Sequence, residues 1–236
     1  MLMPSIFGEN LFNDDWMDFG FPEVDKALYV DSDIIFKKDI SALYDSDITN
    51  YALAGMEDAP NQNALRLGFP ESDLYFNAGF VLLNVKYLRD MDFTNKAMAY
   101  IRDCREKIVL HDQDVLNALL HGKVLFVPIK WNMLDCFYRK PPFIAKKYMR
   151  ELHENLDSPA VIHFSGPLKP WHHGCPHPLR KEYFNYSRKL SWGCQSPDYY
   201  YVFSAFKFPV SLFIWLGCTL EKAERLDRKI RFKKKR

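Results

Sequence analysis

The sequence has no run of the roughly 18 apolar residues that a membrane-spanning helix needs. Residues 1–10 also lack the basic start and the long apolar stretch of a secretion signal. Cysteines are few and odd in number, and none are paired at the C-x-x-C spacing typical of zinc and redox sites. These absences predict a cytoplasmic protein with reduced thiols. The five cysteines are Cys104, Cys136, Cys175, Cys194 and Cys218.

Most of the chain lacks an excess of positive charge, although the net charge of the whole chain is +2. Residues 221–236 hold nine Lys or Arg and three acidic residues, so the preceding 220 residues sum to about −4. A mildly acidic body is not typical of nucleic-acid-binding proteins, and we expect no nucleic-acid partner. Binding of DNA through the basic tail alone is a separate hypothesis, which predicts a salt-sensitive affinity.

The basic tail also has apolar residues at roughly helical spacing. A basic amphipathic helix with Trp and Phe is typical of segments that lie on a membrane surface. We therefore expect a peripheral protein on the inner face of the cell membrane, held to an anionic surface by residues 206–236. The alternative is that the stripe packs on the body and the cations complement the helix C-terminus. The stripe comprises Phe213, Trp215, Leu216, Leu220, Ala223, Leu226 and Ile230.

The pattern of residues 1–205 predicts one α/β domain. The chain is long enough for a sizeable core, and 48% of its residues are hydrophobic. Apolar runs alternate with segments of helical spacing, which predicts a mixed sheet flanked by helices. The predicted strands are 26–30, 51–56, 80–84, 123–127 and 160–164; the predicted helices are 40–44, 92–107 (capped by Asp92 or Thr94) and 112–122; residues 57–74 are predicted as a loop.

Two carboxylates follow the first predicted strand. Asp31 and Asp33 stand one residue apart, where that strand should leave the sheet. In open α/β sheets, ligands bind beyond the carboxyl ends of the strands. Paired carboxylate oxygens there suit a hard divalent cation. The alternative is an ordinary turn, in which the aspartates bond their own backbone.

A second polar group, HFSGPLKPW, begins at the end of the last predicted strand. The imidazole of His163 can complete a metal shell begun by carboxylates. Gly166 permits a close backbone approach, and Lys169 supplies a compact cation that suits a phosphate. A departing diphosphate needs a metal and a lysine, because negative charge grows on it as its bond breaks. Taken singly, His163 would be a core histidine and Lys169 a surface lysine.

Two further segments complete a recognisable set. The sequence YFNAGFVLLN places Asn77 and Gly79 before a predicted strand, and HDQD opens the helix near Asp112. Together with DSD and HFSGPLKPW, and in this order and spacing, they resemble the motifs of the family 8 glycosyltransferases. The resemblance runs from about Phe21 to Trp192. It is nearest to the bacterial branch that adds galactose or glucose to lipopolysaccharide cores.

The resemblance implies a GT-A fold and metal-dependent, retaining transfer from a nucleotide sugar. It implies that Asp31, Asp33 and His163 bind Mn²⁺, with Mg²⁺ as the alternative ion and Asp33 as the stronger ligand. It also implies that Gly166 and Lys169 contact the diphosphate of UDP.

The resemblance assigns the sugar to the other two motifs. Asn77 would help to hold the transferred sugar, Asp112 would bond its hydroxyls, and Gln113 would lie near the anomeric carbon. Asp112 and Gln113 are therefore the candidate catalytic residues, and Asp58 is a further candidate for the same pocket. Retention would proceed through Asp112 as a nucleophile or by front-face attack assisted by the leaving phosphate. The segment HHGCPH matches no standard zinc finger, and the resemblance makes it a substrate-side loop.

The chain departs from the family before Asp31. Family members begin with a strand, an acidic pair and a helix that bind uridine, and the 30 residues before Asp31 contain no such unit. We therefore expect an N-terminally shortened GT-A domain that moves glucose or galactose from a UDP-sugar to a glycan or lipid-linked glycan. The alternative is a truncated remnant, or a non-catalytic protein that binds sugar or nucleotide. A phosphoesterase would need a second metal cluster, which the sequence does not offer.

Overall fold

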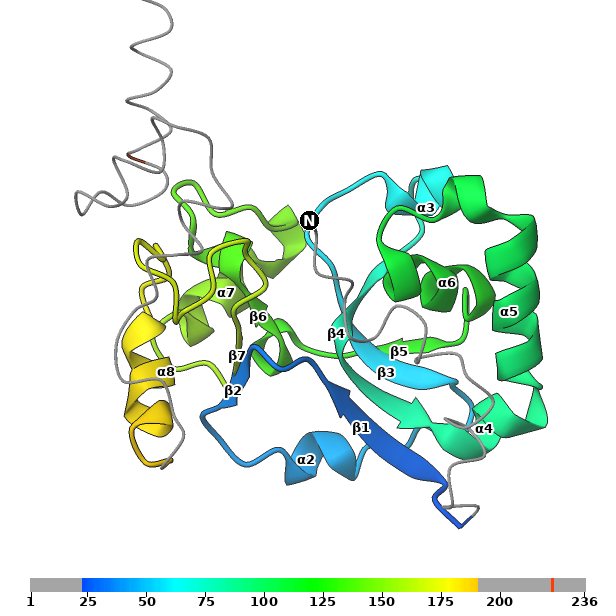
Figure 1. The fold of residues 1–236 in the computed structure, drawn as a ribbon, viewed down its shortest axis with the longest axis horizontal. Helices are drawn as coiled ribbons and strands as arrows, with labels where there is room; N and C mark the ends of the chain where they lie inside the picture. Colours follow the sequence, from blue (N-terminus) through cyan, green and yellow to red (C-terminus); the bar gives the residue numbers. More distant parts are fainter. Residues whose placement is uncertain (1–22, 191–221, 223–236) are drawn as a thin grey trace, which may run out of the picture. The chain divides into compact units, whose positions relative to one another are not determined.

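The computed structural model describes residues 23–190 and Lys222. These residues divide into two compact units (Figure 1). The first comprises residues 23–32, 36–133 and 144–161, and the second comprises residues 33–35, 134–143 and 162–190. The predicted boundary between residues 205 and 206, and the predicted amphipathic stripe, lie outside the described residues and stay predictions.

Four strands form the main sheet of the first unit, in the order β1-β4-β3-β5 (Figure 1). The central strand β4 (Phe76–Asn84) is buried over most of its length, because it is almost wholly apolar. The strands β1 (Lys26–Val30) and β3 (Leu53–Glu57) flank it in antiparallel pairing. The edge strand β5 (Val124–Phe126) pairs in parallel with β3.

The register of this sheet gathers polar residues around the start of β4. Asp31 follows β1 directly, and its backbone N–H donates to the carbonyl oxygen of Gly79 at 2.8 Å. Asp58 follows β3, and its backbone N–H donates to the carbonyl oxygen of Tyr75 at 2.9 Å. The start of β4 therefore has an aspartate on each side.

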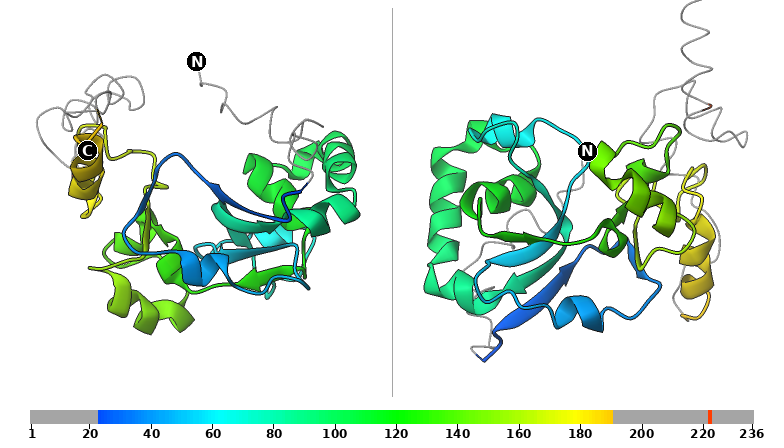
Figure 2. Two further views of the ribbon diagram at one scale, coloured as in Figure 1. Left: turned by 90° about the horizontal axis from the view of Figure 1, so that it is seen from below. Right: turned by 180° about the vertical axis from the view of Figure 1, so that it is seen from behind.

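Three helices pack against this sheet (Figures 1 and 2). They are α4 (Val85–Asp90), α5 (Phe93–Asp103) and α6 (His111–Leu119). The side chain of Asn84 ends β4 and caps α4 by accepting a hydrogen bond from the N–H of Tyr87 at 2.9 Å. Their apolar faces bury a shared core with the sheet, which includes Leu53, Phe76, Val81, Leu88, Ala97, Val115, Leu116 and Leu120.

A second, three-stranded sheet has the order β2-β7-β6. Its strands are β2 (Ile34–Phe36), β7 (Val161–His163) and β6 (Met133–Leu134). A small core of Ile35, Ile162 and Phe164 lies against Leu179 and Tyr183, of which Tyr183 belongs to α8 (Arg180–Ser187). Strand β7 is short and apolar up to its last residue, His163, which places an imidazole at the strand end.

The structure confirms the five predicted strands, with ends that shift by a few residues, and it corrects three other predictions. The predicted loop 57–74 contains a short helix, α3 (Asn63–Leu67). The helix predicted to reach Lys107 ends at Asp103, because Cys104 leaves the helical conformation and a 3-10 turn (Arg105–Lys107) follows. The predicted cap at Asp92 makes no side-chain cap hydrogen bond.

Short elements account for the rest of the described chain. The helix predicted at 40–44 is α2 (Ser41–Tyr44). The helix α7 (Met149–Asn155) follows a segment of 3-10 turns at Ile129–Trp131, Asp135–Tyr138 and Lys146–Tyr148.

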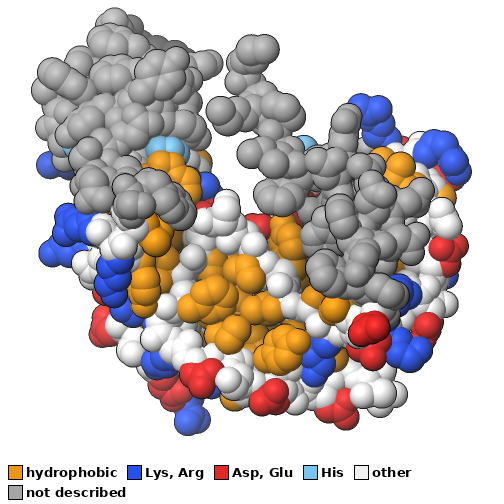
Figure 3. Space-filling view, turned by 60° about the horizontal axis from the view of Figure 1, so that its bottom comes forward, with side chains coloured by type: hydrophobic (Ala, Val, Ile, Leu, Met, Phe, Trp, Pro, Cys, Tyr) orange, Lys and Arg blue, Asp and Glu red, His pale blue; other side chains and the backbone are white. Residues whose placement is uncertain are grey.

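The described surface carries apolar as well as charged side chains. Figure 3 shows a group of hydrophobic side chains with Lys, Arg, Asp and Glu around it. Exposed apolar residues such as Tyr44, Leu65 and Val109 are part of a normal protein surface when they are scattered. Within residues 23–190 and at residue 222, no helix has the length and apolar character needed to cross a bilayer.

Candidate active site

Asp33 is the centre of a compact charged group. Its Oδ1 lies 3.3 Å from Nε2 of His163, and its Oδ2 lies 2.5 Å from Nζ of Lys169. Lys169 also donates to the carbonyl oxygen of Phe164 at 2.9 Å. Burial raises the pKa of Asp33, but the hydrogen bonds and positive charges of His163 and Lys169 outweigh this and hold the pKa at about 2. Asp33 is therefore a carboxylate at every physiological pH.

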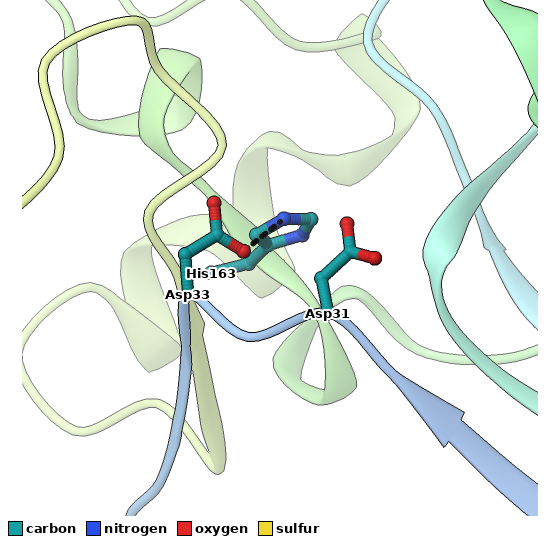
Figure 4. A group of neighbouring side chains, drawn as sticks. All are labelled: Asp31, Asp33 and His163. Atoms are coloured by element: carbon teal, nitrogen blue, oxygen red, sulfur yellow. Dashed lines mark ion pairs between the residues drawn. The ribbon is translucent and has the colours of Figure 1, made fainter. Parts of the chain in front are cut away.

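Asp31 adds a second carboxylate, with Ser32 as the single residue between it and Asp33. Its Oδ1 accepts a hydrogen bond from the hydroxyl of Tyr29 at 3.0 Å. One ligand atom from each of Asp31, Asp33 and His163 lies within 4.8 Å of the others (Figure 4). Two carboxylate oxygens and an imidazole nitrogen are donors that suit a divalent cation. The residues present therefore fit a divalent metal ion.

The turn after β7 has no room for a side chain at Gly166. A Cβ there would lie 2.7 Å from Oδ2 of Asp135. Asp135 itself is tied to the turn, since its backbone N–H donates to Oγ of Ser165 at 3.2 Å. Burial raises the pKa of Asp135, and the nearby charges of Arg139, Lys169 and His163 oppose that rise. Asp135 had no predicted role, because it lies in a segment with no predicted element.

The histidines of the HHGCPH segment stabilise the loop after Lys169 by bonding its backbone. Nδ1 of His172 accepts from the backbone N–H of Lys169 at 3.0 Å, and Nδ1 of His177 accepts from the N–H of Leu179 at 3.1 Å. Burial lowers the pKa of His177 to about 4 and raises that of Cys175 to about 11. A protonated thiol and imidazoles that bond the backbone are typical of a folded loop. Among the described residues, the group suited to a metal is instead the one formed by Asp31, Asp33 and His163.

In the first unit, Gln113 is held by β4 and by Asp58, which follows β3. Its Oε1 accepts from the backbone N–H of Ala78 at 2.9 Å and from Nδ2 of Asn77 at 3.3 Å. Its Nε2 donates to Oδ2 of Asp58 at 3.2 Å. Asn77 in turn accepts at Oδ1 from Nδ2 of Asn132 at 2.9 Å. The structure thus brings together Asn77, Gln113 and Asp58, which the resemblance assigns to the sugar pocket, and adds Asn132.

Asp112 lies in the electrostatic field of Asp31. Burial raises the pKa of Asp112, and the negative charge of Asp31 raises it further. A cation bound at Asp31 would oppose that repulsion, so Asp112 should be a stronger acid when a metal is present.

Asn117 anchors α6 to β4 in the manner of an extra strand. Its Oδ1 accepts from the N–H of Phe76 at 2.8 Å, and its Nδ2 donates to the carbonyl oxygen of Phe76 at 2.9 Å. Asn117 was not among the predicted site residues, although a polar residue next to the apolar face of a predicted helix was the available signal. This anchor keeps the first turn of α6 beside the start of β4.

Comparison with known proteins gives consistent matches. The family model described as "Glycosyl transferase family 8" matches residues 17–175. General stress protein A of Bacillus subtilis (strain 168) is 32% identical over 176 residues, which cover 72% of this chain and 60% of the relative. Lipopolysaccharide 1,2-glucosyltransferase of Escherichia coli (strain K12) is 32% identical over 183 residues, which cover 74% of this chain and 52% of the relative.

Among solved structures, the galactosyltransferase LgtC in complex with donor and acceptor sugar analogs is similar. The TM-score is 0.62 at 26% sequence identity, and the match covers 72% of this chain and 63% of that chain. The likeness confirms the predicted GT-A-like, mixed α/β fold. The chain spans between half and two thirds of the length of these proteins.

Proposed function

This chain belongs to glycosyl transferase family 8, and from that premise we propose that it is a metal-dependent, retaining glycosyltransferase. It moves glucose or galactose from a UDP-sugar to a glycan or a lipopolysaccharide-type acceptor. One observation carries this proposal. Asp31, Asp33 and His163 form a group that could hold a metal ion, and Lys169 forms an ion pair with Asp33. A divalent cation and a lysine ammonium group both stabilise the negative charge that grows on a departing diphosphate.

Each residue has a role in the proposed reaction. Asp31, Asp33 and His163 would hold the cation, which would neutralise charge on the diphosphate when bound. Lys169 places its ammonium group on the diphosphate oxygens, and Gly166 lets the backbone of the turn approach them. The ion pair between Lys169 and Asp33 supports this, because it fixes the ammonium group next to a metal ligand.

The donor sugar is assigned to the start of β4 and of α6. Asn77 and Asp112 bond its hydroxyls, and Gln113 lies beside the anomeric carbon. The side-chain amide of Gln113 is fixed at both ends by Ala78 and Asp58. A fixed amide dipole supports charge that develops on the sugar as its bond to phosphate breaks. Both a nucleophilic Asp112 and front-face attack are compatible with this arrangement.

Calorimetric titration of UDP into the 236-residue chain, with and without Mn²⁺, tests the proposal. We expect binding that requires the metal, followed by transfer from UDP-glucose or UDP-galactose to a glycan acceptor. The alternative of a non-catalytic sugar- or nucleotide-binding remnant predicts UDP binding with neither transfer nor donor hydrolysis. A folded chain that does not bind UDP at any Mn²⁺ concentration would contradict the proposal.

We further propose that the basic tail holds the protein on the anionic inner face of the cell membrane, near a lipid-linked acceptor. Residues 226–236 carry seven Lys or Arg, and each adds about 1 kcal/mol near an anionic surface. Deleting residues 226–236 should therefore release the protein from phosphatidylserine vesicles in a co-sedimentation assay, while transfer to a soluble acceptor stays unchanged. Vesicles of phosphatidylcholine alone are the control, and persistent binding of the deleted chain to anionic vesicles would refute the idea.

A further inference from the structure

A buried carboxylate with no assigned role lies in the first turn of α6. Asp114 is fully buried. Its Oδ1 accepts from Nη2 of Arg66 at 2.7 Å and from the hydroxyl of Tyr75 at 2.7 Å. Its Oδ2 accepts from the backbone N–H groups of Val109 at 2.7 Å and Leu110 at 2.6 Å. Two hydrogen bonds at each oxygen use the full acceptor capacity of a carboxylate.

This saturation separates Asp114 from Asp112, the other carboxylate of the HDQD segment. A nucleophile needs a free lone pair directed at the anomeric carbon, and Asp114 could supply one only by breaking a buried hydrogen bond. Asp114 is therefore not a candidate for the attacking group. Its bonds point to a role in placing its neighbours.

The bonds of Asp114 replace a conventional cap at the start of α6. Leu110 occupies the N-cap position and has no side-chain cap hydrogen bond. His111 follows in the left-handed conformation with φ of 49°, which is uncommon for a residue with a side chain. Asp114 reaches back to two amides that precede the helix, much as the acidic residue of a capping box does. Asp112 and Gln113 lie within this closed loop, so its bonds fix their backbone.

Arg66 connects the cap to α3. Its Nη2 also donates to Oδ1 of Asn63 at 3.1 Å, and its Nη1 donates to the carbonyl oxygen of Lys107. Burial raises the pKa of Asp114, but the hydrogen bonds from Arg66, Leu110 and other donors outweigh this and lower it. Removal of the guanidinium would leave a buried carboxylate without the cation that it contacts, which is strongly unfavourable.

We propose that Arg66 and Asp114 are positioning residues for sugar transfer, which hold the first turn of α6 so that Asp112 and Gln113 face the donor sugar. The inference rests on the proposed function. Neither residue touches the substrate, and both act through the residues they place. Binding of UDP itself is assigned to the metal ligands and Lys169, so it should not depend on Arg66.

The test compares Arg66→Gln, Arg66→Lys and Tyr75→Phe with wild type in the full chain. Arg66→Gln should lower kcat for transfer about 100-fold, as expected for a misplaced catalytic group, while the Kd for UDP with Mn²⁺ stays unchanged. Arg66→Lys should recover part of the loss because it restores the charge, and Tyr75→Phe should cost less because it removes one hydrogen bond from an uncharged donor and keeps the guanidinium. Arg102→Gln, at an exposed arginine of α5 whose side chain is 74% accessible, is the matched control.

Two results would overturn the inference. One is an Arg66→Gln enzyme with the kcat of the Arg102→Gln control. The other is a parallel loss of kcat and UDP affinity in both Arg66→Gln and Tyr75→Phe, which would indicate a general loss of structure.

A failure of the proposed function is distinguishable, because it appears in the wild type. If wild type binds UDP but transfers no sugar, a ratio of dissociation constants replaces kcat as the readout. This gain in affinity is the factor by which UDP-glucose or UDP-galactose binds more tightly than UDP. Arg66→Gln should then abolish that gain, and a retained gain would overturn the inference.

Discussion

Replacement of Asp33 by alanine is expected to abolish sugar transfer and its dependence on Mn²⁺. Asp33 contacts His163 through one oxygen and Lys169 through the other. Its loss would remove a metal ligand and would also release the ammonium group that we assign to the diphosphate. Turnover should fall by more than about 1000-fold, because even the outer-shell partners of a metal are worth about 10- to 100-fold.

Asp39→Ala is the matched control for this prediction. Asp33 directly precedes β2 and Asp39 follows it, but the exposed carboxylate of Asp39 accepts hydrogen bonds from the backbone N–H and the hydroxyl of Ser41. Steady-state rates measured over a range of Mn²⁺ concentrations should be the same for Asp39→Ala and for wild type. An Asp33→Ala enzyme that kept the wild-type rate and metal dependence would refute the metal assignment.

The parts of the site that the sequence could predict are those that follow apolar runs. Asp31 stands after β1 and His163 ends β7, and both strands are visible as short apolar segments bounded by polar residues. The structure brings these side chains and Asp33 within 4.8 Å. The strands could be located because the local sequence sets them. The resemblance to family motifs then connected the polar residues that follow them.

The residues that sequence analysis missed depend on non-local pairing. Asn132 reaches Asn77 across 55 positions of the chain, and Arg66 reaches Asp114 across 48. No periodicity links such positions, because the residues come together only in the folded chain. The helix α3 was missed for a related reason: its five residues form little more than one turn, which is too short for a helical pattern to be seen.

The missed residues also share a physical character. Asp114 and Asn117 are polar side chains buried in the core beneath the site. Burial of such groups is favourable only when their hydrogen bonds are satisfied, and the partners are unknown until the fold is known. A sequence shows only that a residue is polar, while the structure shows whether its hydrogen-bonding capacity is filled. The four hydrogen bonds of Asp114 are what separate it from Asp112.

The second large effect is expected for Lys169→Ala, which should lower turnover by about 100- to 1000-fold, the loss typical of one charge-stabilising group. Lys169 donates to Asp33 at 2.5 Å and to the carbonyl oxygen of Phe164 at 2.9 Å. These bonds hold the ammonium group where a diphosphate bound to the metal would accumulate charge. Lys169→Arg should restore little, because the planar guanidinium does not reproduce the geometry of a compact ammonium group.

Metal affinity separates the role of Lys169 from that of Asp33. Lys169 and a bound cation would compete for the carboxylate of Asp33, so Lys169→Ala should bind Mn²⁺ as tightly as wild type or more tightly, whereas Asp33→Ala should lose the ion. Calorimetry with Mn²⁺ alone measures this, and Lys181→Ala, at an exposed lysine of α8, is the control for the loss of a positive charge.

A Lys169→Ala enzyme with the turnover of the Lys181→Ala control would remove the leaving-group role. A parallel loss of Mn²⁺ affinity and turnover would instead make Lys169 a structural partner of Asp33, since only a leaving-group role predicts slow transfer with the metal still bound.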